Sequence, residues 1–227
     1  MEVIPVINCA DAECVRQKIE AAKTFLPEGN FLHLDVTDGV FATHETWNDP
    51  AGWIGMAPPF GLEVHLMVGH PEKYAESWLG AGAKRLIVHV ETLGDFAVGP
   101  KDEGNESILK ELLQKCAAHG ADLMLALRPE TPVEAFEPFL GAGNSFAFQV
   151  LAVHPGPAAQ EFLPEALKKT KAVRSLVGAN AIIEVDGGMN TLTARLVKDA
   201  GASAIVSASY IFNSADPNRA YQELCGI

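Results

Sequence analysis

Four side chains that can bind metals or transfer protons lie in three apolar segments of the sequence. His33 and Asp35 are two residues apart in a segment of strand type, so both should point to the same face of that strand. His65 lies in a second such segment, and Asp186 ends a third. Two imidazoles and two carboxylates at the ends of three strands would form a metal site, an acid–base site, or both.

A bound cation would explain why these four groups occur together. A single histidine in an apolar segment is more often a hydrogen-bonded core residue than a ligand. Four such groups in one place, however, would include unpaired buried charges, which are costly. We therefore expect a divalent metal on a nitrogen and oxygen ligand set that suits zinc and also manganese, iron or cobalt. The predicted ligands are His33, Asp35, His65 and Asp186.

The two carboxylates also predict a type of reaction. If Asp35 and Asp186 flank a bound sugar, one can remove a proton from carbon while the other returns a proton on the opposite face. The metal would stabilise the oxygen of the enediolate. Such an arrangement is suited to inverting a stereocentre next to a carbonyl group.

The elements that position these residues alternate between strand-like apolar segments and segments with helical spacing. About eight such units in 227 residues predict an α/β fold, a single (β/α)8 TIM-barrel domain over 1–227, with its active site at the carboxyl ends of the strands. An open doubly wound sheet is the alternative, although no GxGxxG motif follows the first strand. We expect strands over 3–7, 31–36, 62–68, 85–90, 122–127, 146–153, 181–185 and 204–207, helices over 11–25, 71–79, 107–119, 132–140, 164–176, 191–200 and 217–224, and long loops over 38–53 and 92–105.

Small residues after the last two strands predict a phosphate site. Gly187 and Gly188 follow the seventh strand, and Ala208 and Ser209 follow the eighth. This fold commonly binds phosphate there, through backbone N–H groups. The loop over 154–160, with its two prolines, either folds over a ligand or forms a rigid turn.

Composition limits the partners and the location. The net charge of -12 argues against a general affinity for nucleic acid, which needs a basic face. The sequence has neither a basic segment followed by an apolar one at its start nor a run of about eighteen apolar residues, so we expect no membrane association and a cytoplasmic location. The cysteines lack a CxxC pair, which favours reduced thiols at Cys9, Cys14, Cys116 and Cys225.

Several motifs together resemble the ribulose-phosphate 3-epimerase family over nearly the whole chain. No single motif is specific, but the set is. The matching motifs are Leu32-His33-Leu34-Asp35-Val36 with Asp38-Gly39, Val64-His65-Leu66-Met67-Val68, Val88-His89-Val90-Glu91, Pro129 with Thr131-Pro132, Val153 with Pro155-Gly156, Gln160 with Phe162, and Glu184-Val185-Asp186-Gly187-Gly188.

The resemblance implies a TIM barrel of the ribulose-phosphate-binding type that interconverts D-ribulose 5-phosphate and D-xylulose 5-phosphate in the pentose phosphate pathway. It also implies a divalent metal, usually zinc or iron, on the four ligands named above, and a homo-oligomer. Asp35 and Asp186 would be the acid–base pair on the two faces of carbon 3. By the same resemblance, the residues that contact substrate and phosphate are Met67, Gly156, Gly187, Gly188, Ala208 and Ser209.

Departures from the family pattern surround this core and keep other functions open. Another ketose phosphate, such as a hexulose 6-phosphate, is the nearest alternative, and a barrel that binds a sugar phosphate without turnover is another. A decarboxylase or aldolase would need a lysine at a strand end, whereas Lys84 precedes its strand. Arg128 could pair with an anionic ligand or with Glu130. The departures are Val6, Thr37, Arg128, Leu151, the segment Pro157-Ala158-Ala159, Ala208, and an apparent insertion over 94–105.

Overall fold

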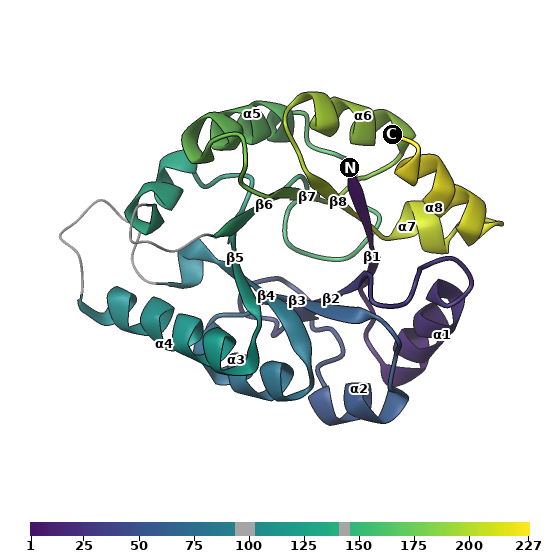
Figure 1. The fold of residues 1–227 in the computed structure, drawn as a ribbon, viewed down its shortest axis with the longest axis horizontal. Coiled ribbons are helices and arrows are strands. Elements are labelled where there is room, and N and C mark those ends of the chain that lie inside the picture. Colours follow the sequence, from purple (N-terminus) through teal and green to yellow (C-terminus); the bar gives the residue numbers. More distant parts are fainter. Residues whose placement is uncertain (94–102, 141–145) are drawn as a thin grey trace.

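A computed structural model describes residues 1–93, 103–140 and 146–227 of the chain. Eight parallel strands pair in chain order and close into a barrel, because the first strand also pairs with the last (Figure 1). The predicted (β/α)8 TIM barrel is therefore confirmed. The strands are β1 (Glu2–Ile7), β2 (Phe31–Thr37), β3 (Gly61–Met67), β4 (Ala83–His89), β5 (Asp122–Leu127), β6 (Ala147–Leu151), β7 (Ile183–Asp186) and β8 (Ala204–Ser207).

Helices surround this barrel and cover the outer face of the sheet (Figure 1). None of the helices described is long and apolar enough to cross a membrane. They are α1 (Ala12–Ala22), α2 (Pro50–Met56), α3 (Pro71–Gly80), α4 (Glu103–His119), α5 (Glu165–Val177), α6 (Thr191–Asp199), α7 (Ser209–Phe212) and α8 (Pro217–Cys225), with 3₁₀ helices η1 (Val90–Thr92) and η2 (Val133–Phe139).

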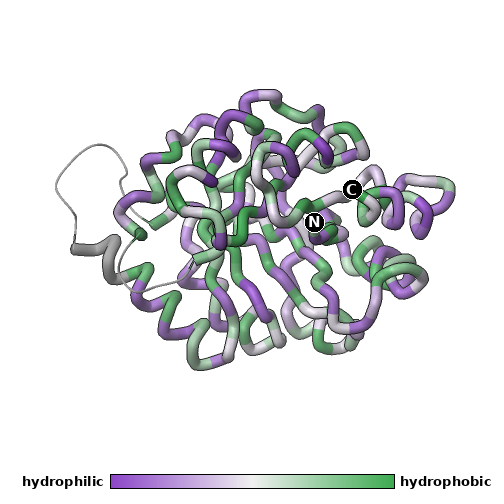
Figure 2. The backbone as a smooth tube through the Cα atoms, turned by 45° about the horizontal axis from the view of Figure 1, so that its top comes forward, coloured by the Kyte–Doolittle hydropathy of each residue, from purple (hydrophilic) through white to green (hydrophobic). Residues whose placement is uncertain are grey.

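The main core lies between the sheet and the helices. Successive side chains of a strand alternate between the two faces of the sheet, so Leu32, Leu34 and Val36 of β2 pack outward in this core. Apolar stretches run through the strands, while the helices alternate between apolar and polar residues, as expected for elements with one buried face (Figure 2). The remaining strand positions point into the barrel, and several of them are polar and buried.

Several element boundaries differ from the sequence-based expectation. The segment over 38–53 is a loop, but helix α2 begins at its end, with Asp49 capping the helix. The segment expected as a helix over 132–140 is the 3₁₀ helix η2, because Pro138 inside it cannot donate a helical hydrogen bond. Strand β6 is shorter than expected, and Lys84 lies within β4, exposed near its amino end. Most of the loop expected over 92–105 lies outside the described residues.

The expectation of reduced thiols is wrong for Cys9 and Cys14, which form a disulfide with a Cα–Cα distance of 5.8 Å. The carboxylate of Asp11 accepts a hydrogen bond from the backbone N–H of Cys14 at the start of α1. This cap folds the chain back between the two cysteines and brings them within reach of each other. Cys116 and Cys225 are free.

Candidate metal centre and active site

The four predicted ligands meet at the carboxyl end of the barrel. Oδ1 of Asp35 lies 3.2 Å from Nε2 of His33 and 3.2 Å from Nδ1 of His65. Oδ2 of Asp186 lies 3.6 Å from the same nitrogen of His65. One donor atom from each of the four lies within 4.8 Å of the others. Two imidazole nitrogens and two carboxylates at this separation suit a divalent cation of the zinc type.

Burial and mutual contact set the charges of this cluster. Burial alone would lower the pKa of His33, but its hydrogen bonds to Asp35 and Glu63 and the charges of both carboxylates raise that pKa well above its usual value. The pKa of His65 is raised for the same reason, by Asp186 and Asp35 against burial. Burial raises the pKa of Asp35, but the hydrogen bonds and charges of the two histidines outweigh it, so this pKa lies well below its usual range. The two histidines thus favour the ionised form of Asp35.

A buried layer of charged groups lies directly beneath His33. Nδ1 of His33 is 2.7 Å from Oε1 of Glu63, and the other oxygen of Glu63 accepts a hydrogen bond from Arg85 at 2.5 Å. Glu184 lies beside this pair and accepts a hydrogen bond from Gln149. Burial and the charge of Glu63 raise the pKa of Glu184 well above its usual value, which favours its protonated form. The charges of Glu63 and Arg85 then balance each other inside the barrel.

A second chain of contacts extends away from His65 toward the barrel wall. Nε2 of His65 lies 2.9 Å from Nε2 of His89, and Nδ1 of His89 lies 3.3 Å from Oε2 of Glu91. Burial lowers the pKa of His89 to about 4, so this imidazole is neutral at physiological pH. A proton on Nδ1 of His89 leaves its Nε2 free to accept from His65. Nε2 of His65 then donates to His89, and Nδ1 is the nitrogen that faces Asp35 and Asp186.

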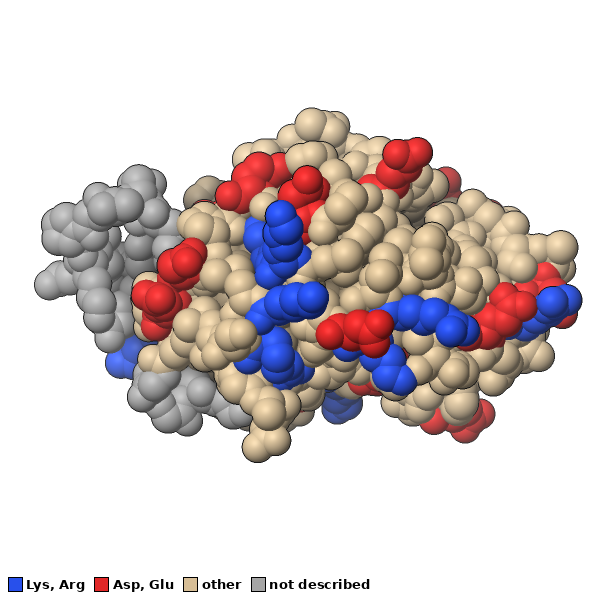
Figure 3. All heavy atoms as spheres, turned by 90° about the horizontal axis from the view of Figure 1, so that it is seen from above, with Lys and Arg blue, Asp and Glu red and all other residues tan. Residues whose placement is uncertain are grey.

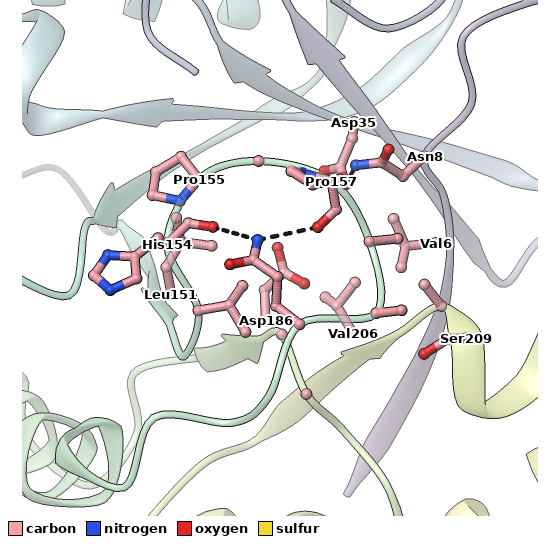
Figure 4. A pocket seen from close by; sticks show the side chains of 18 of the residues that line it. Val6, Asn8, Asp35, Leu151, His154, Pro155, Pro157, Asp186, Val206 and Ser209 are labelled. Atoms are coloured by element: carbon pink, nitrogen blue, oxygen red, sulfur yellow. Dashed lines mark hydrogen bonds between the residues drawn. The ribbon is translucent and has the colours of Figure 1, made fainter. Parts of the chain in front are cut away.

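A pocket opens at the carboxyl end of the barrel, and two of the four predicted ligands, Asp35 and Asp186, line it. His33 and His65 are fully buried and do not reach its surface. Asp35 and Asn8 lie on one side of the pocket, and Asp186 and Val206 lie on the other (Figure 4). All six residues expected to contact substrate and phosphate line it: Met67, Gly156, Gly187, Gly188, Ala208 and Ser209.

The loop over 154–160 passes across the mouth of this pocket (Figure 4). The side-chain amide of Gln160 donates hydrogen bonds to the backbone carbonyls of His154 and Pro157, which ties the two ends of the loop together. Ala159 has a φ of 67°, in the region that favours glycine. The loop therefore lies over the pocket, and its contact with a ligand stays a prediction.

The turn after β7 brings two glycines to the same pocket. A Cβ on Gly187, which has a φ of +110°, would lie 2.5 Å from a methyl group of Val153. A Cβ on Gly188, with a φ of +66°, would lie 2.7 Å from the backbone of Phe162. Only glycine fits these positions, so the backbone of the turn can approach a ligand closely.

Other polar residues near strand ends pair with neighbouring loop residues and not with the metal cluster. Arg128 does not pair with Glu130, and its pairing with an anionic ligand stays a prediction. Its guanidinium stacks on the ring of Phe41 at 3.6 Å and donates to the carbonyl of the same residue, whereas Glu130 pairs with the exposed His154. Of the departures from the family pattern, Val6 and Leu151 line the pocket together with the loop residues and Ala208, while Thr37 does not.

Sequence reasoning missed the buried layer of Glu63, Arg85 and Glu184. Glu63 precedes His65 by two residues, Arg85 precedes His89 by four, and Glu184 precedes Asp186 by two. Side chains an even number of residues apart on a strand point to the same face, so each of the three shares the inner face with its partner. That period is the signal that could have identified them. Asn8 was also missed, although its amide donates to Oδ2 of Asp35 at 2.9 Å. It follows β1 directly, where the barrel places functional residues.

The outer surface over α5 and α6 carries side chains of both charges. Several basic side chains lie next to one another near the middle of this face, with acidic side chains close to them (Figure 3). The predicted metal ligands belong to the strands of the barrel and not to this face.

Comparisons with known proteins agree with this geometry. The model of the ribulose-phosphate 3 epimerase family matches residues 2–212. The chain is 32% identical over 216 residues to the ribulose-phosphate 3-epimerase of Chlamydia pneumoniae, covering 92% of this chain and 87% of that protein. It is 34% identical over 230 residues to the ribulose-phosphate 3-epimerase of Synechocystis sp., covering 99% of this chain and 92% of that protein.

Solved structures share the architecture at lower sequence identity. A crystal structure of 3-hexulose-6-phosphate synthase matches with a TM-score of 0.69 and 16% identity, covering 100% of this chain and 99% of that chain. Identity at this level shows the fold alone. The family match and the two relatives carry more weight because they cover most of the chain at 30% identity or above. The chain is therefore an isomerase and belongs to the ribulose-phosphate 3-epimerase family.

Proposed function

We propose that this protein inverts carbon 3 of a ketose phosphate, with D-ribulose 5-phosphate and D-xylulose 5-phosphate as the two epimers. The observation that carries the proposal is the placement of two carboxylates, Asp35 and Asp186, on one pocket and against one imidazole nitrogen of His65. Epimerisation next to a carbonyl needs a base on one face of the carbon and an acid on the other. Two carboxylates from β2 and β7 meet that requirement.

The proposed step moves two protons. Asp35 takes the proton from carbon 3, which leaves an enediolate, and a protonated Asp186 gives a proton to the opposite face of the same carbon. The reverse reaction exchanges their roles. Asn8 keeps Oδ2 of Asp35 oriented through its hydrogen bond, while the loop over 154–160 keeps bulk water from the intermediate.

The cluster of His33, Asp35, His65 and Asp186 is the proposed cation site. Its donor set fits zinc best, with iron, manganese or cobalt as alternatives. When bound, such a cation supplies positive charge beside the negative charge that develops on the enediolate oxygen. The substrate phosphate would lie against the backbone of Gly187 and Gly188 and the residues that begin α7.

The lining of the pocket motivates a second substrate. Val6 and Leu151 present apolar surface, and Pro157 stiffens the loop that covers the ligand. Another ketose phosphate, such as a hexulose 6-phosphate, is therefore the second candidate. No lysine occurs among the described residues that line the pocket, so Schiff-base aldolase chemistry is disfavoured.

We further propose that this protein forms a homo-oligomer, that it is located in the cytoplasm and that it binds no nucleic acid.

Proton exchange tests the proposed reaction. Protein loaded with Zn²⁺ is incubated in deuterated water with ribulose 5-phosphate and then with a panel of ketose phosphates, and the carbon 3 proton is followed by NMR. We expect loss of that signal and appearance of the epimer. Asp35→Asn and Asp186→Asn should each slow epimerisation by about 10²–10⁴-fold. Asp122→Asn, an exposed carboxylate at the amino end of β5, is the matched control and should act as the wild type.

Two results would contradict the proposal. Full epimerisation by both carboxylate variants would exclude the two-carboxylate mechanism. A metal-loaded protein that exchanges no proton with any sugar in the panel would show that the altered pocket binds a ligand without turning it over.

A further inference from the structure

His33 is held between two carboxylates, and each of its ring nitrogens faces one of them. Nδ1 lies 2.7 Å from Oε1 of Glu63, and Nε2 lies 3.2 Å from Oδ1 of Asp35 in the proposed cation site. His33 and Glu63 are fully buried, at 0% exposure each, so water cannot substitute for either contact. A neutral imidazole has one N–H and one lone pair, and only the nitrogen with the lone pair can bind a metal.

The partner of Nδ1 decides which nitrogen that is. An ionised carboxylate only accepts hydrogen bonds, so Glu63 requires the ring proton to lie on Nδ1. Nε2 then has the lone pair and points toward Asp35. Glu184 cannot take over this role, because its nearest oxygen is 4.0 Å from Nδ1 and already accepts a hydrogen bond from Gln149.

Arg85 fixes Glu63 in turn. It donates to Oε2 of Glu63 at 2.5 Å, and its guanidinium lies 4.4 Å above the ring of Phe31. Arg85 is only 5% exposed, so its charge is held inside the barrel beside that carboxylate. A guanidinium has donors and no acceptor, and it therefore requires an acceptor at the Oε2 position.

We propose that Glu63 and Arg85 are positioning residues that hold His33 in the tautomer with its proton on Nδ1, so that Nε2 is the nitrogen available to the cation. This inference rests on the proposed function, because it needs a cation at the cluster of His33, Asp35, His65 and Asp186. Partners of this kind orient metal-binding histidines in many proteins, and their loss typically costs about 10–100-fold in metal affinity.

The chain offers a substitution that keeps the volume and reverses the hydrogen bond. In Glu63→Gln, Arg85 still requires an acceptor, so the amide oxygen faces Arg85 and the amide NH₂ faces Nδ1 of His33. Nδ1 must then accept, and the ring proton moves to Nε2, where it blocks the cation. Adding Arg85→Met removes this requirement. The amide can then turn its oxygen to Nδ1 and its NH₂ to Oε2 of Glu184, which has no hydrogen-bond partner among the described residues.

Cobalt binding tests this proposal without reference to activity. Co²⁺ is titrated into each protein and its visible absorption gives the dissociation constant. We expect Glu63→Gln to weaken Co²⁺ binding by about 10–100-fold and the double variant to recover most of that loss. Glu184→Gln, a buried carboxyl-to-amide change at a residue that makes no hydrogen bond to His33, with its nearest oxygen 4.0 Å from Nδ1, is the matched control and should bind as the wild type. Urea unfolding of the metal-free proteins shows that each variant is folded.

The tautomer can also be read in the wild type, so the proposal does not depend on a variant that folds. Long-range ¹H–¹⁵N NMR of the Zn²⁺-loaded protein should show His33 protonated on Nδ1. A proton on Nε2 would overturn the proposal, and so would Co²⁺ affinity in Glu63→Gln equal to the wild type or a double variant no better than that single variant. A wild type that binds neither metal would refute the cation site itself, and with it the proposed function.

Discussion

Glu91 allows a quantitative test of how the wall behind His65 is stabilised. One oxygen of its carboxylate accepts hydrogen bonds from the backbone N–H of Arg128 at 2.9 Å and from the hydroxyl of Thr131. The other oxygen lies 3.3 Å from Nδ1 of His89. Burial alone would raise the pKa of Glu91, but the contact with His89 and these hydrogen bonds lower it to about 2, from an ordinary value of 4.5.

The difference between the folded and unfolded pKa of Glu91 can be converted into a contribution to the free energy of unfolding. Each unit of difference between the folded and unfolded pKa is worth 1.36 kcal/mol, so the ionised carboxylate contributes about 3 kcal/mol to the free energy of unfolding near pH 7. Because the pKa is lower in the folded state, the contribution is complete above the unfolded value and is lost as the pH falls toward the folded value of about 2. Glu91→Gln should therefore cost about 3 kcal/mol near pH 7 and progressively less below about pH 4.5.

Urea unfolding followed by tryptophan fluorescence measures this difference across the pH range. A chelator keeps both proteins free of metal, so that only folding is compared. Glu130→Gln is the matched control, because this exposed carboxylate, on the loop after β5 that also carries Arg128 and Thr131, pairs with exposed His154, and it should change the unfolding free energy by less than about 1 kcal/mol. A cost for Glu91→Gln that is the same near pH 3 as near pH 7 would show that ionisation is not its cause. No cost near pH 7 would refute the reasoning altogether.

Three further predictions concern the turn after β7, the loop over the pocket and the disulfide. Gly188→Ala should lower the free energy of unfolding by about 1–3 kcal/mol in urea titrations, because its Cβ would meet the backbone of Phe162 at 2.7 Å in a conformation with positive φ. An unchanged stability would mean that the turn relaxes freely. Gln160→Ala should speed hydrogen exchange of the loop over 154–160 and raise KM while leaving the unfolding midpoint unchanged, since it removes both hydrogen bonds that tie the loop. Equal exchange in both proteins would contradict the role given to Gln160. Reduction of the bond between Cys9 and Cys14, which closes a short loop, should lower the unfolding free energy by about 2 kcal/mol, and thiol counting in denaturant should find two free thiols before reduction. Four free thiols in the unreduced protein would show that the bond is absent.

The fold could be predicted from the sequence because the apolar strand segments and the helical segments alternate regularly along the chain. Each strand is a short apolar segment followed by a helix, and for β5 even the expected bounds, Asp122 to Leu127, match the structure. Prediction was weakest where a proline lies inside a segment whose apolar residues have helical spacing, as Pro138 does in η2. The disulfide was missed because sequence spacing does not show that the cap at Asp11 brings Cys9 and Cys14 together. The prediction of one domain over 1–227 stays a prediction.

Part of the candidate site could also be predicted, because some of its residues stand out in the sequence. The four proposed ligands stand out as polar residues at the ends of apolar strands, and the barrel brings those ends together. Glu63 and Arg85 are harder to identify, because a charged residue in the middle of such a strand gives no sign of its partner on the neighbouring strand. The register that places β3 beside β4 with Glu63 opposite Arg85 becomes known only with the fold. The roles of all these residues stay proposals until metal binding and exchange are measured.

Closure of the barrel limits how this protein can meet another chain. Every strand from β1 to β8 is paired on both sides, so the sheet offers no edge to which a foreign strand could add. Any partner, including a second copy of this chain, must therefore contact helices and loops. Among the described residues, the large apolar side chains that are most exposed there are Val40 at 79%, Leu192 at 66% and Ile54 at 57%. Assembly of this enzyme would thus depend on side-chain packing between surfaces, with shape rather than backbone pairing deciding which partner fits.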